Sequence, residues 1–158
     1  MLKLRTPFAA GALVTMMCLV AAPAKAAAPV TYVSGKGTDS GNCSSPANPC
    51  RRFQFAVDQT SPGGEVKALD PADYRPVTIN KSISITGIVG AGIDTKGGAA
   101  ITINNTSGTI SLANLLIQNV SGSGTTGISA VGGLTLTITH CTVRDLMLGL
   151  TRANSRIS

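Results

Sequence analysis

The sequence has 158 residues, of which 13 are basic and 7 are acidic, and its formal net charge at neutral pH is +6. Lys3, Arg5 and Lys25 lie in the N-terminal 26 residues, and without them the net charge falls to +3. No basic run with interleaved aromatic side chains remains, which argues against nucleic-acid binding. Only 3% of the residues are aromatic. The abundance of Gly, Thr, Ser and aliphatic residues is typical of an all-β protein with many tight turns.

The N-terminus has the three parts of an export signal. A basic start, MLKLR, precedes the apolar stretch Phe8–Pro23, and Ala24-Lys25-Ala26 fits the small-x-small cleavage pattern. The apolar stretch is shorter than the ~20 residues that a membrane-spanning helix needs, which argues against a retained anchor. We therefore expect residues 1–26 to be a signal peptide, with Ala28 as a second exit point. The mature protein is expected in the periplasm or outside the cell, without membrane association.

Two cysteines, Cys43 and Cys50, lie in the loop-rich stretch GNCSSPANPC. An exported protein meets oxidising conditions, so a local disulfide between them is predicted. A metal site is the weaker interpretation, because no second cysteine pair or histidine accompanies these two residues. Cys141 is left unpaired.

Residues 27–64 are expected to form an N-terminal region with one strand and one helix. The strand is predicted at Val30–Ser34. The helix is predicted at Pro49–Thr60, with Asn48 as its N-cap and Pro49 in its first position. Its apolar face has helical spacing and consists of Phe53, Ala56, Val57 and Thr60.

Residues 65–158 contain an internal repeat. The segments Ile83–Val89, Ile110–Leu116 and Leu136–Thr142 align with offsets of 27 and 26 residues, and a preceding triplet recurs at 77–79, 101–103 and 128–130. Each period thus carries three short strands whose first and third residues are apolar and face one way. Stacked periods would bury a continuous interior, so a three-sided solenoid is predicted. The matched positions are Ile83, Ile110 and Leu136; Ile85, Leu112 and Ile138; and Ile88, Leu115 and Cys141.

The only histidine, His140, directly precedes Cys141, which suggests a nucleophilic pair. In the repeat, however, His140 falls at the same corner as Gly87 and Asn114, and these three residue types tolerate positive φ. Cys141 falls at a core position of the repeat, where a cysteine behaves as a small hydrophobe. We therefore favour an architectural role for this pair over a catalytic one.

The three-strand coil at Val77–Val143 resembles the right-handed parallel β-helix proteins of the pectate-lyase-like superfamily, as do the segments Thr31–Val57 and Gly63–Gly87. The resemblance implies an all-β, right-handed, three-sided parallel β-helix of about three coils. It also implies a short N-terminal capping α-helix, with Phe53, Ala56 and Val57 over the first coil. The superfamily includes lyases, glycoside hydrolases, esterases, adhesins and phage fibres, so it implies a fold more than a function.

Enzymes of this superfamily act on acidic polysaccharides, and the lyases hold Ca²⁺ with carboxylates, so Ca²⁺ is implied by resemblance only. Either lyase or hydrolase chemistry needs several converging carboxylates. Asp70 and Asp73 are the only close acidic pair and are weak candidates for a metal site, although an ordinary turn is the favoured interpretation. No catalytic residue is assigned. The expected outward-facing residues are not acidic: Thr78, Thr102 and Ser129; Ser84, Ser111 and Thr137; Val89, Leu116 and Thr142.

The C-terminal segment departs from the repeat. The next strand of the first sheet is expected near residue 154, but the chain continues as Leu146–Ser158. Leu146, Met147, Leu148 and Leu150 could cover the end, although an uncapped end, as in a truncated version of a longer protein, is the favoured interpretation.

Two functional hypotheses follow. The first is an exported β-helix protein related to polysaccharide lyases and glycoside hydrolases, with polysaccharide as its partner and without catalytic competence at this length. The alternative is a non-catalytic cell-surface or envelope protein that uses the solenoid as a binding scaffold. Convergent carboxylates or the release of unsaturated sugars would favour an enzyme, and tight glycan binding without turnover would favour the scaffold.

Overall fold

The computed structural model describes residues 26–120, 126–131, 133–145 and 147–151, with side chains described as far as residue 145. Apart from Ala26, the predicted signal peptide lies outside the described residues, as do Leu146 and residues 152–158 of the C-terminal segment. No helix in the described part of the chain is long and apolar enough to cross a membrane.

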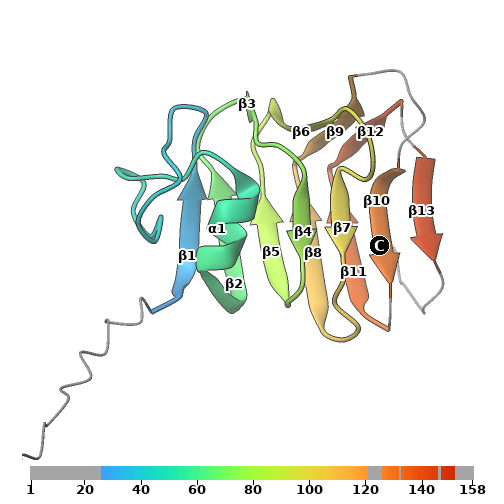
Figure 1. The fold of residues 1–158 in the computed structure, drawn as a ribbon, viewed down its shortest axis with the longest axis horizontal. Helices are drawn as coiled ribbons and strands as arrows, with labels where there is room; N and C mark the ends of the chain where they lie inside the picture. The colour runs from blue at the N-terminus through green and yellow to red at the C-terminus, as the bar shows by residue number, and fades with distance from the viewer. Residues whose placement is uncertain (1–25, 121–125, 132, 146, 152–158) are drawn as a thin grey trace, which may run out of the picture.

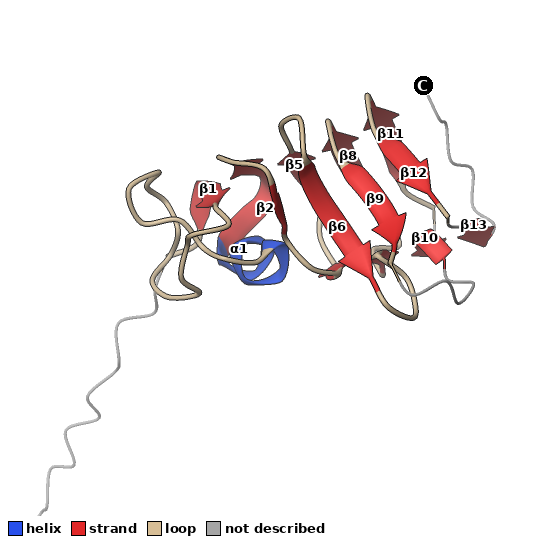
Figure 2. Ribbon diagram, turned by 90° about the horizontal axis from the view of Figure 1, so that it is seen from above, coloured by secondary structure: helices blue, strands red, loops and turns tan. Residues whose placement is uncertain are grey.

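Three parallel sheets and one short helix, α1 (Phe53–Gln59), make up the described structure (Figures 1 and 2). Sheet A contains β1 (Ala28–Val33), β2 (Thr60–Ala68), β5 (Ile83–Thr86), β8 (Thr109–Ala113) and β11 (Thr135–Thr139). Sheet B contains β3 (Ala72–Asp73), β6 (Ala91–Thr95), β9 (Leu116–Asn119) and β12 (Thr142–Arg144). Sheet C contains β4 (Val77–Ile79), β7 (Ile101–Ile103), β10 (Thr126–Val131) and β13 (Met147–Thr151).

From β2 onward the chain passes through sheets A, B and C in turn and then begins again, so that each strand pairs with the strand one period earlier. All ten strand pairings of the described residues are parallel. This arrangement is consistent with a parallel β-solenoid, in which every period buries its apolar side chains against the next.

The predicted register of sheets A and C is confirmed. In sheet A, Ile85 pairs with Leu112 and Leu112 with Ile138; Ile83, Ile110 and Leu136 form a second column. In sheet C, Val77, Ile101 and Ile128 pair in the same way. These side chains are buried, except that Ile138 is only partly so. A shift of one residue would turn each column outward, so the apolar pattern itself selects the register.

The predicted alignment of the third strands is wrong for the first repeat. Gly92, not Val89, pairs with Leu116, because residues 88–90 form a turn in which Ala91 donates to the Ile88 carbonyl at 2.9 Å. Val89 is 94% exposed and Ile88 is 39% exposed. Ile88 is therefore not a core position equivalent to the buried Leu115.

The prediction for the C-terminal segment also needs correction. Residues Met147–Thr151 form β13, which pairs with β10, so the next strand of this sheet arrives before residue 154. Ser129 pairs with Gly149, 20 positions later, whereas Thr102 and Ser129 are 27 positions apart. The connection between sheets B and C is shorter here, and a loop can change length without disturbing the strands it joins.

The helix begins later than predicted. Its N-cap is Arg52 rather than Asn48, because Cys50 is extended beside β1. The Cys50 N–H donates to the Tyr32 carbonyl at 2.9 Å, and the Cys50 carbonyl accepts from Ser34 at 2.8 Å. These backbone groups are therefore not available to a helix. At the other end, Thr60 belongs to β2, and its hydroxyl donates to the Ala56 carbonyl at 2.7 Å.

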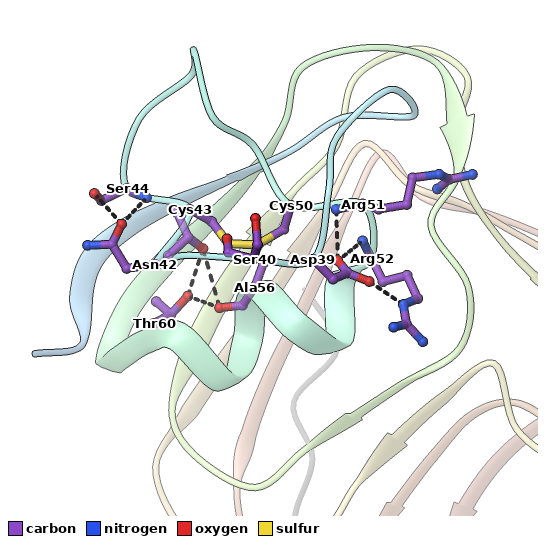
Figure 3. Close-up of a disulfide and its surroundings, with 11 residues drawn as sticks. Asp39, Ser40, Asn42, Cys43, Ser44, Cys50, Arg51, Arg52, Ala56 and Thr60 are labelled. Atoms are coloured by element: carbon purple, nitrogen blue, oxygen red, sulfur yellow. Dashed lines mark hydrogen bonds and ion pairs between the residues drawn. A yellow bond between two sulfur atoms is a disulfide. The ribbon is translucent and has the colours of Figure 1, made fainter. Parts of the chain in front are cut away.

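The disulfide between Cys43 and Cys50 is present, as predicted (Figure 3). Its two Cα atoms are 5.4 Å apart, and both residues are buried. Because Cys50 is also bonded to β1, the disulfide fixes the loop that leads into α1.

Helix α1 packs against β1 and β2 of sheet A and β4 of sheet C, at the N-terminal end of the stack. Phe53, Ala56 and Val57 are buried, as predicted. The Gln54 side chain accepts the Thr78 N–H at 2.7 Å and approaches the Thr78 carbonyl with its amide nitrogen at 3.4 Å. The Arg51 side chain donates to the Asp73 carbonyl at 2.8 Å. Polar side chains thus occupy hydrogen-bonding groups of the edge strands β3 and β4.

Candidate functional site

His140 has a corner conformation rather than the setting of a catalytic base. Its φ is +53°, and the φ of Asn114, which occupies the equivalent corner one period earlier, is +56°. The Asn114 N–H donates to the Thr139 carbonyl at 3.1 Å, which ties the two corners together. His140 itself is exposed. Asn and His are among the residue types that tolerate this left-handed region, as the sequence indicated.

Gly87, which occupies the equivalent corner one period before Asn114, is glycine for a different reason than predicted. Its φ is not positive. A Cβ atom at this position would lie 2.3 Å from the Asn114 carbonyl oxygen. Glycine is therefore required by the close approach of the next corner, not by a left-handed backbone.

Cys141 is a free thiol that is half-buried against the core. Its sulfur lies 3.5 Å from the Thr139 carbonyl and 3.6 Å from that of Leu112. Burial raises the pKa of this thiol. A nucleophilic cysteine needs a lowered pKa, so the environment favours an inert thiol.

Asp70 is engaged by the protein's own donors. Its carboxylate accepts the Ser34 hydroxyl at 2.7 Å, the Gly35 N–H at 2.7 Å and the Tyr74 hydroxyl at 2.5 Å. Burial alone would raise the pKa of Asp70, but these bonds, led by that from Tyr74, lower it below its usual range. Burial, reinforced by Asp70, raises the pKa of Tyr74. Asp70 thus joins the residues that follow β1 to the turn after β2.

Asp73, the other candidate for a metal site, lies in β3. Its Oδ1 accepts the backbone N–H groups of Arg75 at 2.9 Å and Asp94 at 3.1 Å, and its Oδ2 lies 3.7 Å from Arg75 Nε. No group of three or more His, Cys, Asp or Glu side chains in the described ranges is arranged to hold a metal ion.

The outer faces of sheets A and C carry hydroxyl side chains. Thr78, Thr102 and Ser129 are paired in sheet C. Ser84, Ser111 and Thr137 form the corresponding column in sheet A, where Glu65 precedes them. The Glu65 carboxylate accepts the Thr86 hydroxyl at 2.8 Å and lies 3.1 Å from Lys67 Nζ. Glu65 is thus satisfied locally.

The outer face of sheet B has the most varied chemistry, and sequence reasoning missed it. Asp94, Gln118 and Arg144 pair in register on β6, β9 and β12, and together present an acidic, an amide and a basic side chain. The predicted alignment treated residues 88–90 as strand rather than turn, and this error hid the column. Aligning Ile93 with Ile117 and Val143 would have revealed it, because these residues alternate with the polar ones.

Two open hollows flank this column. One, of about 450 Å³, lies beside Asp94 and is lined by Asp73, Arg75, Pro76, Asp94, Thr95, Lys96, Gly97 and Val120. The other, of about 380 Å³, contains Arg144 and is lined by Ile88, Val89, Gly90, Asn114, Leu115, Leu116, His140, Thr142 and Arg144. We call the column together with its two hollows the sheet B face. Both volumes are in the range of ligand sites.

Comparison of the chain with models of known protein families, with curated proteins and with solved structures found no match in any of the three. The functional interpretation therefore depends on the chemistry of the described residues.

Proposed function

We propose that the protein is an exported, right-handed parallel β-helix of the pectate-lyase-like type that binds a polysaccharide along the sheet B face without cleaving it. The observation that carries this proposal is the in-register column of Asp94, Gln118 and Arg144 between two hollows. Export is supported by the signal-like N-terminus and agrees with the disulfide.

The column suits sugar hydroxyl groups. A carboxylate accepts hydrogen bonds, a guanidinium donates them, and an amide does both. The three side chains can therefore bind sugar hydroxyl groups that act as donors or as acceptors. Because they lie on adjacent strands of one sheet, they repeat at the strand spacing of about 4.8 Å. A linear polymer can meet such a repeat along its length, whereas a compact ligand would reach one or two of the side chains.

The second hollow adds apolar surface beside these polar groups. Ile88 and Val89 are exposed, and with Leu116 they line the hollow that also contains Arg144. Sugar rings have polar edges and apolar C–H faces, and burial of apolar area is favourable at about 25 cal/mol per Å². We propose binding rather than cleavage because lyase and hydrolase chemistry needs several converging carboxylates, and the Asp73 carboxylate, which lines the hollow beside Asp94, is already bonded to Arg75 and to the Asp94 backbone.

The test is affinity electrophoresis of the purified protein in gels containing polygalacturonate or a neutral glucan. We expect retardation by at least one of them, weakened by about five- to ten-fold in Gln118→Ala and Arg144→Ala, since each removes one or two hydrogen bonds. Ser111→Ala, at a register position of the sheet A column, is the matched control and should leave retardation unchanged.

Two outcomes would contradict the proposal. Equal retardation of all three variants would exclude the sheet B face as the binding surface. Release of unsaturated sugars or of new reducing ends from either polymer would show that the protein is an enzyme, and the lyase or hydrolase alternative would replace the binding scaffold.

A further inference from the structure

Another hollow, which shares the lining residues Arg75 and Pro76 with the hollow beside Asp94, is dominated by arginine. Its volume is about 460 Å³, and its lining residues are Arg51, Arg52, Gln54, Arg75 and Pro76. We call it the arginine hollow. Three of these five residues are cationic and none is acidic, whereas the lining of the hollow beside Asp94 includes the carboxylates of Asp73 and Asp94.

Each arginine keeps donors for a ligand after its contacts within the protein. Arg52 Nε pairs with Asp39, Arg51 Nη1 donates to the Asp73 carbonyl, and Arg75 Nε lies near Asp73. A guanidinium has five N–H donors, and these contacts involve one nitrogen of each group. The side chains of Arg52 and Arg75 are 56% and 65% exposed, so a ligand can reach them.

The backbone holds Arg51 and Arg52 in place before any ligand arrives. Asp39 accepts the N–H groups of Arg51 at 2.8 Å and of Arg52 at 3.0 Å, and the disulfide residue Cys50 directly precedes them. Burial would raise the pKa of Asp39, but the bonds from Arg52 and Arg51 lower it, so this anchor stays charged. Figure 3 shows both arginine side chains extending away from the disulfide.

Arg75 has an unusual backbone conformation. Its φ is +67°, and its N–H donates to the Asp73 carboxylate at 2.9 Å. Positive φ is unfavourable for a residue with a long side chain, and such conformations cluster at functional sites. Strand β3 ends at Asp73, so Arg75 lies beyond the strand, at the point where it lines the hollow.

We propose that the arginine hollow binds a phosphate group carried by a larger ligand. A phosphate monoester offers up to two negative charges and three acceptor oxygens, which matches three guanidinium groups better than a single carboxylate does. Arginine is suited to this role because its planar fork can donate two parallel hydrogen bonds. The hollow exceeds the space that one inorganic ion needs and falls in the range of small-molecule sites, so part of a sugar or headgroup fits beside the phosphate.

The test is an NMR titration of the purified protein, at constant ionic strength, with inorganic phosphate, glucose 6-phosphate and glucose. We expect saturable shifts from glucose 6-phosphate at the amides of residues 51–54 and 75, and none from glucose. Inorganic phosphate should bind at the same amides more weakly. Raising the salt concentration should weaken binding, because both partners are charged.

Variants assign the effect to the arginines. Arg52→Gln and Arg75→Gln should each weaken binding of glucose 6-phosphate by about ten-fold, the value of a lost charge-assisted hydrogen bond. Arg75→Lys should lose less, since it keeps the charge but not the fork. Lys67→Gln, which removes the same charge from sheet A, is the matched control and should leave affinity unchanged.

Absence of saturable binding would overturn the proposal, as would shifts confined to residues outside the hollow, and neither result depends on a variant folding. Equal affinity of Arg52→Gln, Arg75→Gln and Lys67→Gln would also overturn it. Binding of inorganic phosphate without binding of glucose 6-phosphate would refute the larger ligand. Failure of glycan binding and failure of phosphate binding are distinguishable, because the two tests use different ligands and share no variant.

Discussion

The two ends of the stacked sheets differ in how their last strands are covered. At the N-terminal end, Phe53 is fully buried and its ring centroid lies 4.7 Å from that of Tyr74 in the first period. At the other end of the described side chains, Val143 on β12 is 39% exposed, whereas Ile117, which pairs with it on β9, is fully buried. Among the described side chains, the same column of a sheet is thus covered at its N-terminal end and partly exposed at Val143, which we call the open end.

The difference shows that the repeat alone does not bury its terminal side chains. Interior periods are covered because each has a neighbour on both sides. In sheets B and C the first period has a strand neighbour on one side only. On the other side α1 adds an apolar face for the core, and Gln54 of α1 and the preceding Arg51 bond to the strand edges. Three predictions test how much stability this arrangement provides.

The largest effect is expected from removing the buried aromatic ring of Phe53 at the covered, N-terminal end. Phe53→Ala should lower the free energy of unfolding by about 3–5 kcal/mol, because a buried aromatic ring is replaced by a cavity. Val143→Ala, in the open end, should cost less than about 1 kcal/mol, since this side chain is already partly in water. Urea denaturation followed by circular dichroism measures both values. Equal losses would show that the two ends do not differ energetically.

A smaller effect is expected from the corner between sheets A and B. Gly87→Ala should cost about 1–3 kcal/mol, because the added Cβ meets the Asn114 carbonyl and the backbones must move apart. His140→Gly, at the same corner in a later period, should change stability by about 0.5 kcal/mol or less, as glycine also accepts its positive φ. Thermal unfolding of the two variants gives the comparison, and a larger loss for His140→Gly would contradict this account of the corner.

The smallest effect, and the one that depends on pH, is expected from Asp70→Asn. The variant should lose about 1 kcal/mol at neutral pH, since the amide keeps the shape of the carboxylate but not its charge. The folded-state pKa of Asp70 is lowered from 3.8. Its contribution is therefore complete above this value and is lost as the pH falls through the lower, folded-state pKa.

Unfolding measured from pH 7 to acidic pH should accordingly show the wild-type advantage over Asp70→Asn shrinking below about pH 4. Asp145→Asn makes the same charge change at the open end and is the control, with no expected loss of stability. A difference that stayed constant across the acidic range would mean that the contribution of Asp70 does not depend on the ionisation of its carboxylate.

The periodic part of the fold could be predicted from the sequence because apolar side chains at every second position select both a strand and its register. Columns such as Ile85, Leu112 and Ile138 were found in this way. The corner role of His140 was also predictable, since residue type and repeat position agree. These features follow from the alternation of neighbouring residues and from the regular repeat along the chain.

What the sequence did not reveal depends on contacts between distant residues. The helix start moved to Phe53 because Cys50 bonds to β1, and the Asp94 column was hidden because the turn at residues 88–90 shifted the alignment. The arginine hollow joins Arg51 and Arg52 with Arg75, which is more than 20 positions away. No local pattern predicts such a meeting.

Gln54 carries a consequence for self-association. The amide side chain of Gln54 bonds to both the N–H and the carbonyl of Thr78, so it occupies backbone groups of β4 to which a neighbouring strand would otherwise bond. A foreign strand that sought to extend sheet C from this side would have to displace it. Edge-to-edge association through β4, which could lead to fibrils, is therefore disfavoured at the N-terminal end of sheet C by a single glutamine side chain.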